Sequence, residues 1–64
     1  MAPDILPTPE AATYLRLSKP TLERLRLTGD GPPYAKLGKA VRYRRADLDA
    51  WLASRLIRST SEGA

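Results

Sequence analysis

A short basic segment is the part of this sequence best equipped to do chemistry. Residues 1–30 sum to a charge of zero and residues 46–64 to −1, so residues 31–45 carry +5 and are the source of the formal net charge of +4. Positive charge concentrated in this way attracts a polyanion, and we expect nucleic acid ahead of a membrane surface. The segment contains no acidic residue and carries the cations Lys36, Lys39, Arg42, Arg44 and Arg45.

The composition argues against catalysis. The chain has no His and no Cys, which removes the commonest general base, the commonest metal ligand, thiolate metal sites and disulfides. Asp47 and Asp49 could suggest a carboxylate pair, but at i and i+2 on a helix they do not face each other. Their position near a helix start, where the dipole favours negative charge, explains them. We therefore expect no enzyme, no cofactor and no metal.

The length and hydropathy suit one small domain that does not span a membrane. At 64 residues the chain is near the lower limit for folding alone. It has no apolar run of the ~20 residues that a membrane span needs and no basic-then-apolar signal pattern at its start. We expect a soluble, cytoplasmic protein with a domain over residues 6–57 and flexible termini at residues 1–5 and 58–64.

The first expected helix begins at Thr8. Thr is a good N-cap residue and Pro9 suits the first helical position. Ala11, Tyr14 and Leu15 follow at i, i+3 and i+4, so they form one apolar stripe that should face the core.

The second expected helix begins at Ser18, a capping residue, with Pro20 in its first turn. It runs through Leu27, and Gly29 ends it as the left-handed residue. Because only about three residues connect the helices, they must cross sharply, which is helix–turn–helix spacing.

A hairpin and a third helix complete the expected fold. Strands over 34–37 and 41–44 are separated by a turn at 38–40. Alternation buries Val41 and Tyr43 and directs Arg42 and Arg44 outward. The third helix spans 46–57, with an apolar stripe of Leu48, Trp51, Leu52 and Leu56 and Trp51 as core anchor. The sequence thus predicts an α+β winged helix–turn–helix domain: three helices, with a two-stranded hairpin wing between helices 2 and 3.

In such a module the start of the second helix meets base edges in the major groove. Arg24 is the best candidate for reading a base, because its fork matches the two acceptors of guanine. Lys19 and Thr21 suit phosphates or bases at the edge of the footprint, and Glu23 could accept from cytosine or pair with a neighbouring Arg. A solvated helix face is the alternative, but the capped helix before it and the short turn favour an interface. The predicted recognition set is Ser18, Lys19, Pro20, Thr21, Glu23 and Arg24.

The predicted wing contacts are Lys36, Lys39, Arg42 and Arg44, with Lys39 at the turn nearest the DNA backbone. Charged side chains on edge strands also prevent aggregation. That alternative could explain Lys36 by itself, but it explains less well a whole segment with several cations and no acid.

Stacking of nucleic-acid bases on tyrosine rings is a further alternative. Tyr14 and Tyr43 fall on expected core faces, so packing explains them better. For Tyr34 the sequence does not decide between packing and base stacking. Leu27 falls on the exposed side of its helix, where it could contact protein or a thymine methyl group.

Several motifs over residues 6–56 resemble the small excisionase-like, or AlpA-like, helix–turn–helix domains related to the MerR winged-helix group. The motifs are the Pro-Glu-Ala-Ala start at 9–12, Leu17-Ser18, Thr21-Leu22, Gly38 with basic strand residues, and Asp-Leu-Asp-Ala-Trp-Leu at 47–52. Two features depart from the pattern: Arg26 and Leu27 replace an apolar and a polar residue of many relatives, and the loop at 28–33 is slightly long.

The resemblance implies sequence-specific binding to double-stranded DNA without an effector domain. The leading role it implies is an excisionase-type recombination directionality factor of a phage or integrative element. Such a factor binds repeated sites cooperatively beside neighbouring copies of itself and an integrase. A small transcriptional activator or repressor using the same surface is the second possibility. An RNA or single-strand binder, or a protein-interaction module, belongs to a different class.

Overall fold

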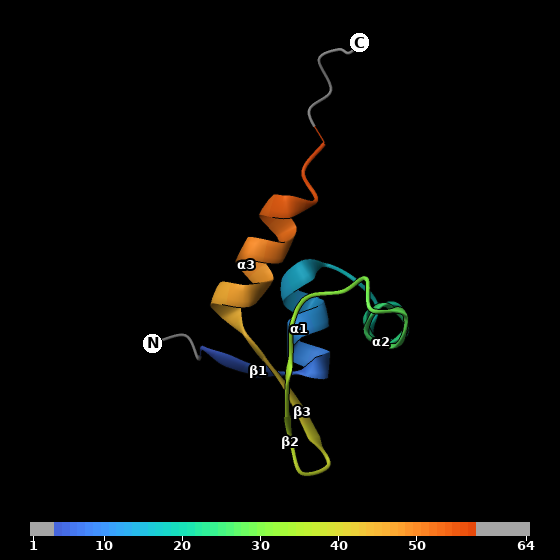
Figure 1. Cartoon of the computed structure of the whole chain (residues 1–64), viewed down its shortest axis with the longest axis vertical. Helices are drawn as coiled ribbons and strands as arrows, with labels where there is room; N and C mark the ends of the chain where they lie inside the picture. Colours follow the sequence, from blue (N-terminus) through green and yellow to red (C-terminus); the bar gives the residue numbers. More distant parts are fainter. Residues whose placement is uncertain (1–3, 58–64) are drawn as a thin grey trace.

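Three helices and a small antiparallel sheet make up the described residues, 4–57, in a computed structural model (Figure 1). The expectations for residues 1–3 and 58–64 lie outside these residues. The predicted α+β winged helix–turn–helix architecture is confirmed, because the hairpin lies between the second and third helices. The elements, in order, are β1 (Ile5–Pro7), α1 (Thr8–Leu15), α2 (Lys19–Thr28), β2 (Ala35–Leu37), β3 (Ala40–Arg44) and α3 (Arg45–Ser54).

The sheet has a strand that the sequence analysis did not predict. Its order is β1-β3-β2, with both neighbours antiparallel to β3. Ile5, expected to be flexible, pairs with Arg44, and the N–H of Arg45 donates to the Asp4 carbonyl at 2.7 Å. Three residues ending in Pro7 carry too little alternation to be recognised as a strand. β1 exists because β3 has a second edge to pair with, and proline is tolerated on an edge strand.

Three large side chains from three different elements lie at the centre of the core. The largest fully buried side chains are Leu22 of α2, Tyr43 of β3 and Leu48 of α3. Each such burial contributes roughly 1.5–3 kcal/mol for an aliphatic side chain. They pack with a buried set completed by Leu6, Ala11, Ala12 and Leu15, and with the partly buried Leu17, Val41 and Trp51.

α1 begins at Thr8 and buries Ala11 and Leu15 as predicted, but its cap and one core position differ from expectation. Pro7, not Thr8, is the N-cap residue and no side chain caps the helix, while Thr8 is helical and buried. Tyr14 is 44% exposed and Ala12 only 2%, so Ala12 takes the core position predicted for Tyr14. The small side chain lets α1 approach its neighbours. The Tyr14 hydroxyl instead donates to the Asp49 carboxylate of α3, and this hydrogen bond raises the pKa of Tyr14.

The turn and the caps around α2 follow the sequence closely. Ser18 Oγ accepts from the Thr21 N–H at 3.3 Å, and Gly29 ends the helix at φ 81°, as predicted. Between α1 and α2, Arg16 takes the left-handed conformation at φ 62°. Its neighbour Leu17 donates its N–H to the Ala12 carbonyl at 2.8 Å. Together these bonds close the short turn that makes the two helices cross.

α3 is shorter than the predicted span of 46–57. It ends at Ser54, and Leu52 and Leu56, expected to be buried, are 45% and 74% exposed. Figure 1 shows α3 projecting past the α1–α2 pair, and the C-cap residue Arg55 donates to the Asp30 carbonyl at 2.7 Å. Trp51 is half-buried, and its indole N–H donates to the Asp30 carbonyl at 3.0 Å, so it anchors the loop after α2 as well as the core.

Candidate DNA interface

The exposed side of α2 carries the predicted recognition set. Leu22 is the residue of α2 that points into the core. Pro20 and Arg24 lie about 200° around the helix from it, and both are exposed. Lys19 is also exposed, at the first position of the helix.

Most polar groups of the recognition set already have partners. Ser18 and Thr21 share a hydroxyl–hydroxyl bond of 2.7 Å besides the cap, so both hydroxyls are committed to the start of α2. Lys19 Nζ lies 3.9 Å from Glu23 Oε2, an exposed pair of the kind that contributes little stability. Within residues 4–57, Arg24 has neither an ion pair nor a side-chain hydrogen bond. Its guanidinium group is therefore available to a ligand.

The hairpin tip offers a second available cation. Leu37 pairs with Ala40, so the loop is the two residues Gly38 and Lys39 rather than the predicted 38–40. Gly38 has φ 65°, and a positive φ at the first loop position is typical of a tight type II′ turn. Lys39 is exposed at the tip and has no ion-pair partner in the described part of the chain.

The other predicted wing cations do not share one surface. Residues opposite each other in neighbouring strands lie on the same face of a sheet. Lys36 pairs with Val41, so it lies on the face that bears Tyr43 and the helices, near the tip. Arg42 and Arg44 lie on the other face. The hairpin is thus charged on both sides and at its end.

Arg42 and Arg44 are held by contacts within the protein. Arg42 is half-buried rather than fully outward, and its Nη1 donates to the Val41 carbonyl at 2.9 Å. Arg44 lies at the root of the hairpin, opposite Ile5. Its Nε and Nη2 bond the two Asp47 carboxylate oxygens at 2.7 and 3.0 Å. Hydrogen bonding to Arg44 lowers the pKa of Asp47, and the same contact raises the pKa of Arg44.

A family model described as a helix-turn-helix domain matches residues 5–56. This span begins in β1 and extends past the end of α3, so it contains every element described above. The chain belongs to this helix-turn-helix family. The family binds DNA and is not typically enzymatic, so α2 and the hairpin are the candidate contact surfaces. A comparison with curated proteins finds no significant match.

Two further features of the helix-turn-helix domain concern metal ligands and membrane spans. Over residues 4–57 no group of three or more potential metal-ligating side chains comes together. No helix in the same range has the length and apolar character needed to cross a membrane.

Arg26 of the helix-turn-helix domain has contacts that the sequence analysis missed. Its Nη1 lies 3.4 Å from both the Thr8 hydroxyl and the Tyr43 hydroxyl. Its guanidinium carbon lies 5.8 Å from the centre of the Tyr34 ring, and that ring packs on Tyr43 with centroids 6.0 Å apart. The sequence identified Arg26 only as a departure from the family pattern. Tyr34, whose role the sequence left open, contacts Arg26 and Tyr43 with one part of its ring and is 46% exposed.

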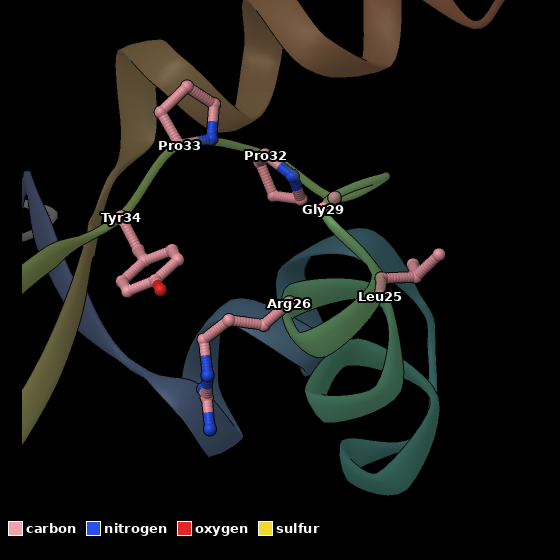
Figure 2. A pocket seen from close by; sticks show the side chains of 7 residues that line it. Leu25, Arg26, Gly29, Pro32, Pro33 and Tyr34 are labelled. Atoms are coloured by element: carbon pink, nitrogen blue, oxygen red, sulfur yellow. The ribbon is translucent and has the colours of Figure 1, made fainter.

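A cavity of about 340 Å³ lies beside Arg26, between the end of α2 and the segment leading into β2 (Figure 2). Figure 2 shows the Arg26 side chain and the Tyr34 ring along one side of it, and the two prolines along another. Space therefore separates the last turn of α2 from the root of the wing. The lining residues are Leu25, Arg26, Gly29, Gly31, Pro32, Pro33 and Tyr34.

Proposed function

We propose that this helix-turn-helix domain recognises a specific sequence of double-stranded DNA. The start of α2 enters the major groove and the hairpin tip contacts the adjacent backbone. The availability of Arg24 supports this most directly, because an exposed guanidinium without a partner in residues 4–57 lies on the outward face of α2. Its two parallel donors match guanine O6 and N7.

The remaining contacts divide between positioning and affinity. Lys19 and Lys39 place exposed charge at the start of α2 and at the hairpin tip, where each can neutralise a phosphate. Lys36 adds charge on the helix-facing side of the hairpin. Arg44 reaches a phosphate only by leaving Asp47, so its contribution is smaller than its charge suggests.

The rest of the recognition set has supporting roles in the proposal. Ser18 and Thr21 order the first turn of α2, Pro20 shapes its exposed edge, and Glu23 orients Lys19. Arg42, half-buried in the sheet, contributes long-range attraction more than direct contact.

The biological role that we propose is an excisionase-type directionality factor, acting in the cytoplasm on DNA of a phage or integrative element. The resemblance of residues 6–56 to excisionase-like domains supports it. Leu27, Leu56 and Ile57 are 85%, 74% and 89% exposed, and they offer apolar contacts to neighbouring copies on DNA or to an integrase. A transcriptional regulator using the same interface is the alternative.

A titration on duplex DNA tests the proposal. Labelled duplexes from beside the gene, a scrambled duplex of the same composition and the matching single strand are compared at one salt concentration. A specific reader should prefer one duplex by at least about 10³-fold. Equal affinity for the scrambled duplex would refute sequence recognition, and tighter binding to the single strand would favour the other class of binder.

The same gels separate the two biological roles. Stepwise bands on a duplex with repeated sites, each forming more readily than the last, indicate the cooperative assembly expected of an excision factor. A single complex that covers a promoter indicates a regulator.

A further inference from the structure

We infer that Arg26 is a positioning residue, which sets the angle between α2 and the hairpin and so controls whether both can contact one DNA site. This inference rests on the proposed function. It concerns a residue with no assigned role in DNA recognition, on the side of α2 turned towards the wing.

The contacts of Arg26 join four parts of the fold. The guanidinium donates to Thr8 at the start of α1 and to Tyr43 in the middle of β3, at 3.4 Å in each case. It also lies over the ring of Tyr34, which precedes β2. In Figure 2 the side chain leaves α2 below that ring. One side chain of the recognition helix thus links α1 to β3 and to the segment that leads into β2.

The last turns of α2 reach the wing mainly through the loop that follows them. The Leu25 carbonyl accepts from the N–H groups of Asp30 and Gly31, at 3.1 and 3.2 Å. Leu22 is the one fully buried residue of α2, and a helix pinned at one point can still pivot. Leu25, one turn nearer the C-terminal end, is only half-buried and lines the 340 Å³ cavity with Arg26. Arg26 supplies the side-chain hydrogen bonds that run directly from this part of α2 to α1 and β3, whereas the loop bonds hold only the chain end of the helix.

The angle between α2 and the hairpin depends on the shape of the Arg26 guanidinium group more than on its charge. Within residues 4–57 no carboxylate lies within 4 Å of Arg26; its partners are two hydroxyls and an aromatic face. Both hydrogen bonds leave the single nitrogen Nη1, and the planar guanidinium to which it belongs lies over the Tyr34 ring. A lysine ammonium carries the same charge but is a compact group that cannot stack in this way. We therefore expect Arg26→Lys to restore charge without restoring the angle.

The first experiment uses no DNA. Residual dipolar couplings of backbone amides in the 64-residue chain report the orientation of α2 relative to the sheet. Arg26→Met keeps the length of the side chain and removes its donors, and Arg24→Met is the matched control on the same helix. In Arg26→Met we expect the couplings of α2 and those of β1 and β3 to require a different orientation of the helix relative to the sheet than in the wild type. In Arg24→Met we expect the wild-type orientation to fit both sets of couplings.

The second experiment adds the preferred and scrambled duplexes. Arg26→Met should lower the sequence preference by about 2- to 30-fold, the range typical of residues that act through others. Lys39→Ala should cost less affinity in the Arg26→Met background than in the wild type, because the tip no longer reaches the backbone together with α2. A variant that merely lost stability would keep the full Lys39 effect under conditions where it is folded.

Wild-type couplings and an unchanged sequence preference in Arg26→Met would overturn the inference. If Arg26→Met does not fold, the double variant Thr8→Val, Tyr43→Phe removes both acceptors and leaves Arg26 in place. Couplings unchanged in that variant would overturn the inference equally. If the wild type shows no sequence preference, the proposed function fails. The couplings then still decide whether Arg26 sets the angle of α2.

Discussion

Replacing Arg24 and Lys39 separately by alanine should divide sequence preference from general affinity for DNA. Both side chains are exposed and have no ion-pair partner within residues 4–57. Neither variant removes a contact that holds the fold. The free energy of unfolding should therefore change by no more than about 0.5 kcal/mol, as for surface substitutions in general. Changes in binding then report the interface.

The two variants should differ in which quantity they change. Losing a bidentate contact with guanine costs about 1–3 kcal/mol of discrimination, so Arg24→Ala should lower the affinity for the preferred duplex by about 5- to 150-fold. Its affinity for the scrambled duplex should change far less. A lysine on a phosphate contributes about 0.9 to the slope of log affinity against log salt. Lys39→Ala should therefore lower that slope by about 0.9 on both duplexes.

Fluorescence anisotropy at several salt concentrations measures both quantities. Between about 50 and 200 mM salt, one phosphate contact accounts for an affinity change of about 3.5-fold, which is well resolved by titration. Thermal melts of each variant control for folding. Two results would refute the reasoning: equal losses on both duplexes for Arg24→Ala, or a loss of sequence preference for Lys39→Ala.

Three further predictions concern the scaffold. Leu22→Ala removes a fully buried side chain and should cost about 2–5 kcal/mol in urea unfolding; a smaller loss would show that α2 is not seated in the core. Ser18→Ala removes the cap of α2 and should cost about 0.5–2 kcal/mol, whereas Ser18→Thr serves as the control that retains a hydroxyl. Because the Arg44 hydrogen bond lowers the pKa of Asp47 in the folded chain, the stability from this pair is present above the unfolded pKa of about 3.9 and is lost as pH falls through the folded pKa. The difference in Tm between wild type and Asp47→Asn should therefore shrink below about pH 4, and a gap that stays constant to about pH 2 would contradict this assignment.

Features that depend on neighbouring residues along the chain were predictable. Ser18 caps α2 and Gly29 ends it because both effects act within a turn of helix. The hairpin forms around Gly38 for a similarly local reason, a positive φ that glycine adopts at little cost. The concentration of charge at residues 31–45 needs no structure at all.

Features that depend on how the elements meet were not predictable. Both Ala12 and Tyr14 fit an apolar stripe on α1, and only the packing of α1 against its neighbours decides that Ala12 is buried. β1 requires the open edge of β3. The end of α3 depends on where its neighbours stop covering it, so an apolar stripe that continues to Leu56 does not extend the helix.

The candidate interface shows the same division. By itself the sequence determined that a capped helix with an exposed Arg24 precedes a basic hairpin, because capping, turn geometry and charge are local properties. Only the tertiary structure decided which cations are available. It directs Arg26 to Thr8 and Tyr43, which lie 18 and 17 positions away along the chain. Such hydrogen bonds exist only once packing has brought their elements together, and no periodicity in the sequence encodes them.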